Sequence, residues 1–243
     1  MKRHDFIKKG LGSLGGMVTA LAFLNSCETD EVAVVEESTG VTSDPTVTPA
    51  SCSVTNSETE GPFPTKSPGS FITQNIVSDR TGTPLTIKIY IRNVNDGCKI
   101  IQGAVVDIWH CDAAGNYSQY GGTQMQSTNY SSVSFLRGRQ STDTNGMTGW
   151  TSIFPGWYSG RAPHIHVHVY SASGNSLLVT QIAFPPEVCK VVYAQGVYAS
   201  HGQADTTNER DNVFGDGYTN ELATVTGSVS AGYELTHTIF VKG

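Results

Sequence analysis

The sequence predicts an all-β protein: a single antiparallel β-sandwich domain with long loops over residues 52–243, preceded by a signal peptide and a disordered tether. Gly, Thr, Ser and Val are abundant in the chain, whereas Lys and Glu are scarce. No long stretch outside the N-terminus shows helical periodicity, and several short segments alternate between apolar and polar residues. Short alternating segments separated by turn residues are typical of sandwiches and barrels.

The first 26 residues have the pattern of a bacterial lipoprotein signal peptide. Four basic residues precede an apolar stretch, residues 11–24, that is too short to span a bilayer comfortably. Residues 24–27 resemble a lipobox, which implies cleavage before Cys27 and attachment of lipid to its thiol. We therefore expect an exported, membrane-anchored lipoprotein on the periplasmic face or the cell surface. An ordinary secretory signal is the alternative, and it also exports the protein.

Residues 27–51 are rich in Glu, Thr, Val and Pro and show no sustained period, as in a flexible tether. The formal net charge of the whole chain is −6. An acidic chain lacks the basic surface that nucleic-acid binding requires, so we expect no nucleic-acid partner.

Four cysteines follow position 27, namely Cys52, Cys98, Cys111 and Cys189. An even number of cysteines in an exported chain predicts two disulfides, with three possible pairings. The alternative is that some of these thiols are free and buried.

The clearest predicted strand covers residues 84–95, where every second residue is a large aliphatic one: Leu85, Ile87, Ile89 and Ile91. A second, mostly apolar strand covers residues 103–109 and ends in a polar turn, residues 110–117. Residues 118–136 carry little pattern and predict a long loop.

The remaining predicted strands lie in the second half of the chain. A turn at residues 142–146 precedes a strand near residues 148–154. The other elements are two strands at residues 164–170 and 177–184 joined by a hairpin-like connection, a long polar excursion at 185–220, and closing strands at 221–229 and 233–241.

The residues with the clearest chemical meaning lie between positions 155 and 166. This stretch contains Tyr158, Arg161, His164 and His166, and the predicted strand begins at His164. Side chains at i and i+2 of a strand share a face and lie about 6.6 Å apart along it. The two histidines can therefore bind one metal ion while the residues between them enter a core. A nearby tyrosine favours iron(III) over zinc, because a hard, oxidised metal prefers phenolate.

Five segments together resemble the intradiol ring-cleavage dioxygenases, the family that contains the catechol and protocatechuate dioxygenases. The segments are residues 59–63, 103–113, 136–140, 155–166 and 181–184. The resemblance covers nearly all of residues 52–215 and is nearest to the exported, single-domain members. It implies a β-sandwich that binds non-haem Fe(III) and cleaves a catechol-type diol with O₂.

The resemblance also implies a role for each candidate site residue. Tyr117 matches the equatorial tyrosine ligand, and Tyr158 matches the axial tyrosine that leaves the iron and acts as a base for the diol. His164 and His166 match the two histidine ligands. Arg161 matches an arginine that stabilises negative charge on the substrate ring, and Gln181 matches a glutamine that lies against that ring.

The sequence departs from the better-known cytosolic members at one place: the spacing between Tyr158 and His164 is shorter than in those proteins. The short form is common in the exported subgroup, and it changes the expected shape of the substrate pocket. The predicted reaction inserts both atoms of O₂ between the hydroxylated carbons and gives a cis,cis-muconate-type diacid. The identity of the diol and the oligomeric state stay open.

Several alternatives use the same residues differently. His168 shares a face with His164 and His166 and is expected outside the ligand set, as is His110, for which a structural hydrogen bond to backbone fits equally well. A non-catalytic, lipid-anchored binding module of the prealbumin or carboxypeptidase-regulatory type would fit the same strand pattern. The full set of metal ligands discriminates between the two functions, because a binding module has no reason to carry it.

Overall fold

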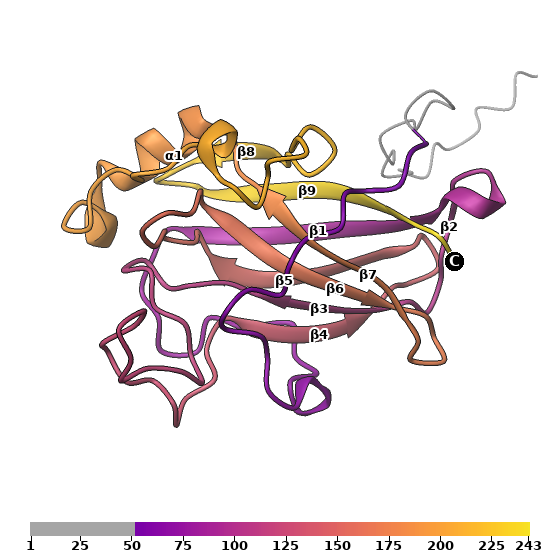
Figure 1. Cartoon of the computed structure of the whole chain (residues 1–243), viewed down its shortest axis with the longest axis horizontal. Helices are drawn as coiled ribbons and strands as arrows, with labels where there is room; N and C mark the ends of the chain where they lie inside the picture. The colour runs from indigo at the N-terminus through magenta and orange to yellow at the C-terminus, as the bar shows by residue number, and fades with distance from the viewer. Residues whose placement is uncertain (1–51) are drawn as a thin grey trace, which may run out of the picture. The chain divides into compact units, whose positions relative to one another are not determined.

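The computed structural model describes residues 52–243 (Figure 1). The predictions of a signal peptide, a lipid on Cys27 and a tether fall outside these residues. The predicted all-β sandwich is confirmed: two sheets pack face to face around one main core. In the described part of the chain, no helix is both long and apolar enough to cross a membrane.

The first sheet is built around the longest strands of the chain. Its order is β2 (Lys99–Ile100), β1 (Pro84–Asn93), β9 (Gly232–Val241) and β8 (Thr224–Ser228), and β5 (Met147–Ile153) also pairs with β1. The pairing of β1 with β9 is parallel, and the other pairings in this sheet are antiparallel.

The second sheet carries the candidate site. Its order is β4 (Arg137–Ser141), β3 (Val105–Trp109), β6 (His164–Tyr170) and β7 (Ser176–Ala183), and all three pairings are antiparallel. The register places Trp109 opposite His166 on one side and Gln181 opposite His166 on the other. Paired residues lie on the same face of a sheet, so these three side chains form one row across its outer face.

Alternation along β1 and β6 explains why the two sheets pack together. The aliphatic residues of β1 are at most 1% exposed, and the odd-numbered residues of β6 from Ile165 to Val169 are fully buried in the same core. Because the side-chain period of a strand is two, the even-numbered residues of β6 must point away from this core. The hydrophobic pattern therefore determines which face of the sheet displays the histidines.

Two elements differ from the prediction. The region 185–220 contains α1 (Pro186–Tyr193), which buries Cys189, Val192 and Tyr193 on one side. Two turns are too short to produce a recognisable helical period, and Pro186 is tolerated because it occupies the first turn. Strand β4 was not predicted, because Arg137 and Arg139 stand where a half-buried strand usually has apolar residues.

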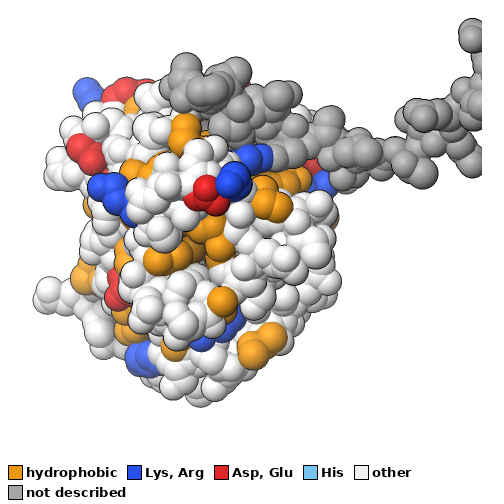
Figure 2. Space-filling model, turned by 90° about the vertical axis from the view of Figure 1, so that its right-hand side faces the viewer, with side chains coloured by type: hydrophobic (Ala, Val, Ile, Leu, Met, Phe, Trp, Pro, Cys, Tyr) orange, Lys and Arg blue, Asp and Glu red, His pale blue; other side chains and the backbone are white. Residues whose placement is uncertain are grey.

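The outer surface of the described domain is mixed. On the face shown in Figure 2, basic and acidic side chains are interspersed with small groups of apolar side chains.

The prediction of two disulfides is wrong. Cys52 and Cys98 form one disulfide, whereas Cys111 and Cys189 are free and buried. Each free thiol packs in a different hydrophobic cluster, Cys111 beside Trp109 and Cys189 in the main core, so they do not meet. Burial raises the pKa of the Cys189 thiol to about 12 and that of Cys111 also rises, which keeps both protonated.

Replacing Cys52 by serine should lower the free energy of unfolding. The disulfide closes a segment with a sequence separation of 46 residues. The loop-entropy relation gives about 4 kcal/mol for a loop of this size, and disulfides typically contribute about 2–4 kcal/mol. Urea unfolding under oxidising conditions measures the difference. In the presence of dithiothreitol the wild type and Cys52→Ser should become equally stable. A difference that persists under reductant would mean that side-chain packing, and not the cross-link, stabilises this end of the domain.

Candidate functional site

Strand β6 places two histidines on the face opposite the core. His164 is 3% exposed and His166 is 1% exposed. Their Nε2 atoms lie 3.1 Å apart, with the two rings nearly perpendicular. Two nitrogens that approach this closely in a water-excluded place can share a proton or a cation.

Neighbouring groups orient both imidazoles. The Nδ1 of His164 lies 2.6 Å from the carbonyl oxygen of Ala162, which can only accept a hydrogen bond. Nδ1 must therefore carry the proton, and Nε2 of the neutral ring has a free lone pair. The ring of His166 stacks on Trp109 at 4.9 Å with an interplanar angle of 4°. The cross-strand pairing of β3 with β6 thus fixes the plane of the second imidazole.

Both histidines are neutral at physiological pH. Burial lowers the pKa of His164 well below its usual value, and the charge of Arg161 adds to the effect. Burial also lowers the pKa of His166, with His164 as the next contributor. Neutral imidazole is the form that binds metal ions.

Tyr117 reaches the histidines from the turn that follows β3. The carboxylate of Asp112 accepts the N–H groups of Ala114 and Asn116 and so shapes the turn. The N–H of Tyr117 donates to the side-chain oxygen of Gln126, which anchors the tyrosine backbone. Its hydroxyl lies 3.4 Å from His164 Nε2, and its side chain is fully buried.

Tyr158 approaches the same point from the loop before β6. Its ring centroid lies 5.8 Å from those of Tyr117 and His164. Its hydroxyl accepts a hydrogen bond from Nη1 of Arg161 at 3.2 Å. Tyr158 is only half-buried, whereas Tyr117 is sealed from solvent.

Burial raises the pKa of both phenols. The pKa of Tyr117 lies well above its usual value because its hydroxyl has left water. The pKa of Tyr158 is also raised by burial, and the charge of Arg161 opposes the rise. A bound metal cation reverses this balance, because it favours the phenolate that burial alone disfavours.

The donor atoms fit a single metal ion. Imidazole nitrogen binds zinc at about 2.0–2.1 Å, so two such donors in adjacent positions around one ion lie about 3.0–3.4 Å apart. The separations of 3.1 Å between the two Nε2 atoms and 3.4 Å between Tyr117 and His164 have this size. Two neutral nitrogens with one or two phenol oxygens form a donor set that suits Fe(III).

Arg161 lies at the centre of a polar network beside these donors. Its Nε donates to both carboxylate oxygens of Asp211 at 2.9 Å, and its Nη2 donates to the side-chain oxygen of Gln181. The amide nitrogen of Gln181 donates to the carbonyl oxygen of Thr59. A buried amide needs such partners, and they hold Gln181 next to the histidines.

All six predicted site residues therefore come together: Tyr117, Tyr158, Arg161, His164, His166 and Gln181. The other tyrosines near Tyr117 do not join them: Tyr120 donates to the carbonyl oxygen of Pro64, and Tyr130 packs on Phe135. His168 contacts Glu60, Ser176 and Tyr170 on the exposed part of the same face.

His110 serves the structure and not the site. Its Nδ1 contacts the carbonyl oxygen of Cys111 at 2.8 Å, and its Nε2 contacts the hydroxyl of Ser152 at 2.7 Å. Burial lowers its pKa to about 4, so the ring is neutral.

Two residues of the site were not singled out from the sequence. Asp211 holds Arg161 although it lies 50 residues away in a region without pattern. Arg137 is buried, and its guanidinium donates to Ser118 and Phe63, which fastens the loop that carries Tyr117. An arginine that interrupts an otherwise uncharged stretch was the available signal for Arg137, and no signal pointed to Asp211.

Comparison with known proteins identifies the family of the chain. A dioxygenase family model matches residues 60–209, more than half of the chain. The protocatechuate 3,4-dioxygenase beta chain of Burkholderia cepacia is 32% identical over 124 residues, which are 47% of this chain. That match spans about half (51%) of the length of the relative.

Solved structures share both sequence and fold with the chain. An intradiol ring-cleavage dioxygenase from Tetranychus urticae is 30% identical, with a TM-score of 0.70 over 78% of this chain and 95% of its own. The dioxygenase domain of a carbohydrate-binding fusion protein from Streptomyces sp. SirexAA-E is 26% identical, with a TM-score of 0.55 over 77% and 97%. The family model and these relatives place the chain in the intradiol ring-cleavage dioxygenase family.

Proposed function

We propose that the protein is a non-haem Fe(III)-dependent intradiol dioxygenase that acts on a catechol-type diol. The observation that carries the proposal is the convergence of two neutral imidazole nitrogens and a buried phenol within 3.4 Å of one another. The reaction adds both atoms of O₂ to the diol, breaks the bond between the two hydroxylated carbons, and gives a cis,cis-muconate-type diacid. No other reactant is needed for the atoms to balance.

His164, His166, Tyr117 and Tyr158 would hold the iron. Bound there, Fe(III) would act as a Lewis acid that binds both diol oxygens and makes the ring reactive toward O₂. Tyr117 suits a permanent ligand because it is sealed from solvent and anchored by its backbone. Tyr158 suits an exchangeable one because it is only half-buried.

Tyr158 would take up a proton from the incoming diol on its hydroxyl oxygen. That oxygen already accepts a hydrogen bond from Arg161, so the guanidinium favours the phenolate before the proton arrives. The same guanidinium would then face the anionic substrate, and Gln181 would lie against its ring. A preorganised charge of this kind stabilises negative charge as it develops, without reorganisation.

The export and the partners are part of the same proposal. A lipid on Cys27 would anchor the protein to a membrane, with the diol and O₂ as its small-molecule partners. An exported enzyme of this type would act on diols outside the cytoplasm.

Oxygen uptake by the iron-loaded protein with a panel of diols tests the proposal. We expect one O₂ consumed per diol, and a product that carries both atoms of ¹⁸O₂ by mass spectrometry. Protein treated with a chelator is the control and should be inactive until iron is restored. Iron-loaded protein that consumes no O₂ with catechol, hydroxyquinol or protocatechuate would favour the binding-module alternative.

Tyr158→Phe should lower kcat by about 100-fold, the lower range for loss of a positioned acid–base group. Iron should stay bound, because three donors remain. The measurement combines oxygen uptake with the visible phenolate-to-iron absorption, which should weaken but persist. Tyr120→Phe is the matched control, since that hydroxyl bonds to backbone. Unchanged activity in Tyr158→Phe would remove this tyrosine from the proposed mechanism.

A further inference from the structure

Three carboxylates outside the candidate iron site lie close together. One oxygen from each of Glu58, Asp216 and Glu221 lies within 4.8 Å of the other two. Glu58 belongs to the segment before Gly61, and the other two belong to the loop that precedes β8. We call these residues the carboxylate cluster. Their like charges repel, so the arrangement needs something that compensates it.

One carboxylate oxygen of Glu221 has no partner among the described residues. Its side chain is fully buried, and one carboxylate oxygen accepts a hydrogen bond from the hydroxyl of Thr180 at 3.0 Å. The other oxygen has no hydrogen-bond partner, and neither has one oxygen of Glu58. A buried carboxylate oxygen without a donor or cation is costly. The Glu221 side chain points into the cluster, where one of its oxygens lies within 4.8 Å of an oxygen of each of the two other carboxylates.

Arginine and lysine do not supply the missing charge. Among residues 52–243, no ion pair involves any member of the cluster. The charge of Arg161 lowers the pKa of Glu58, but its guanidinium is already paired with Asp211. Arg161 therefore compensates the three carboxylates only in part.

The pKa values of Glu58 and Glu221 are raised, as expected for carboxylates that lack compensating positive charge. Burial, followed by the charge of Glu58, raises the pKa of Glu221 to about 8. Burial, followed by the charge of Asp216, raises the pKa of Glu58 to about 7. At pH 8 the cluster therefore holds excess negative charge in a partly dry place.

We propose that Glu58, Asp216 and Glu221 bind a hard divalent cation, with Ca²⁺ as the best match. Ca²⁺ holds oxygen ligands at about 2.3–2.6 Å, so two oxygens on one ion lie at most about 5 Å apart. The spread of the three oxygens fits within this limit. An all-oxygen set with no nitrogen or sulfur is typical of sites for calcium, magnesium or manganese.

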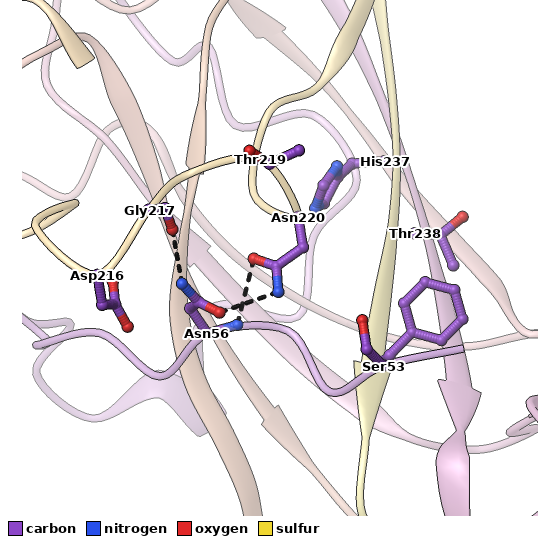
Figure 3. Close-up of a pocket in the computed structure, with 9 residues that line it drawn as sticks. Ser53, Asn56, Asp216, Gly217, Thr219, Asn220, His237 and Thr238 are labelled. Atoms are coloured by element: carbon purple, nitrogen blue, oxygen red, sulfur yellow. Dashed lines mark hydrogen bonds between the residues drawn. The ribbon is translucent and has the colours of Figure 1, made fainter. Parts of the chain in front are cut away.

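A neighbouring cavity gives the site access to water. Asp216 lines a cavity of about 560 Å³, shown in Figure 3 with Asp216 on the loop beside Asn56 and Asn220. Ca²⁺ takes six to eight oxygens, and water from this side can supply those that the three carboxylates leave open.

The cation would fasten two distant parts of the chain. The side chains of Asn56 and Asn220 already hydrogen-bond to each other (Figure 3), and Asn56 also donates to the carbonyl oxygen of Gly217. A Ca²⁺ ion bound by Glu58, Asp216 and Glu221 would join the same two segments a second time, next to these hydrogen bonds. Next in sequence to Glu58 is Thr59, whose carbonyl oxygen holds the amide of Gln181. The inference itself does not depend on the proposed ring cleavage.

Thermal unfolding of the purified protein at pH 8 tests the site with Ca²⁺ as the probe. We expect 10 mM Ca²⁺ to raise Tm by about 5–10 °C over protein in chelator, if that concentration is about 100 times Kd. Equilibrium dialysis should find one Ca²⁺ per chain. At pH 5 the rise should be smaller, because pH 5 lies below the raised pKa values of Glu58 and Glu221 and protons then compete with Ca²⁺ for both carboxylates.

Variants decide whether the cluster is responsible. Asp216→Asn and Glu221→Gln should lose the rise in Tm and the bound Ca²⁺, whereas Glu187→Gln, an exposed carboxylate on α1, should keep both. Asp216 is exposed, so its variant should fold even if Glu221→Gln does not. No rise in Tm for the wild type, or an equal rise in Asp216→Asn, would overturn the inference.

Discussion

Replacing His164 by alanine should remove the metal and lower ring-cleavage activity at least about 1,000-fold. Loss of a residue that only hydrogen-bonds to a metal ligand typically lowers metal affinity or activity by about 10–100-fold. His164 is proposed as a ligand itself, so its loss should have a larger effect. Its Nε2 lies 3.4 Å from the hydroxyl of Tyr117 and 3.1 Å from Nε2 of His166, so the alanine variant loses the centre of the donor set. Metal content by mass spectrometry and oxygen uptake measure the two effects.

His168→Asn is the matched control for this variant. It lies on the same strand and the same face, but its ring contacts Glu60 and Ser176 instead of the other histidines. We expect it to keep both iron and activity. Equal losses in the two variants would show that any histidine on this face matters for folding, and would contradict a specific role for His164. Circular dichroism checks that both variants are folded.

The parts of the fold that sequence could predict are those in which one face meets the core. In β1 and β6 the apolar residues alternate without interruption, so both the strand and the buried face follow from the pattern. Strand β4 lacks the apolar alternation of a strand because Arg137 is buried in it and donates to carbonyl oxygens of two loops. No local pattern reveals these partners. The parallel pairing of β1 with β9 joins elements from the two ends of the domain, and local sequence carries no information about it.

Some residues of the candidate site could likewise be predicted from local sequence, and others could not. Strand geometry predicted that His164 and His166 share a face, and Tyr158 lies only six residues before the first of them. Tyr117 arrives from another loop, and only the resemblance to a family pointed to it. The even number of cysteines predicted two disulfides without fixing their pairing, and counting cannot tell that Cys111 and Cys189 each pack in a separate cluster. Long-range partners are set by tertiary packing, and the same is true of Asp211.

Arg161→Gln should lower both activity and stability, for separable reasons. Activity should fall by about 100–1,000-fold, as when one preorganised group that stabilises developing negative charge is lost. Stability should fall by about 3–5 kcal/mol, because removing one partner of a buried ion pair leaves the other charge uncompensated. The side chain of Asp211 is fully buried, and that of Arg161 is 12% exposed. Oxygen uptake and urea unfolding measure the two losses.

The double variant Arg161→Gln/Asp211→Asn separates the two roles. The N–H groups of Ala162 and Val213 donate to different oxygens of Asp211 in the wild type, so an asparagine can accept only one of them, but it carries no charge that needs a partner. Stability should therefore recover in part, because the uncompensated charge is gone but one backbone N–H has lost its acceptor. Activity should stay low, because no cation has returned beside Tyr158. If activity recovered together with stability, Arg161 would only be a structural partner of Asp211. If neither recovered, the guanidinium would stabilise the loop through Gln181 and Tyr158 instead of through the ion pair.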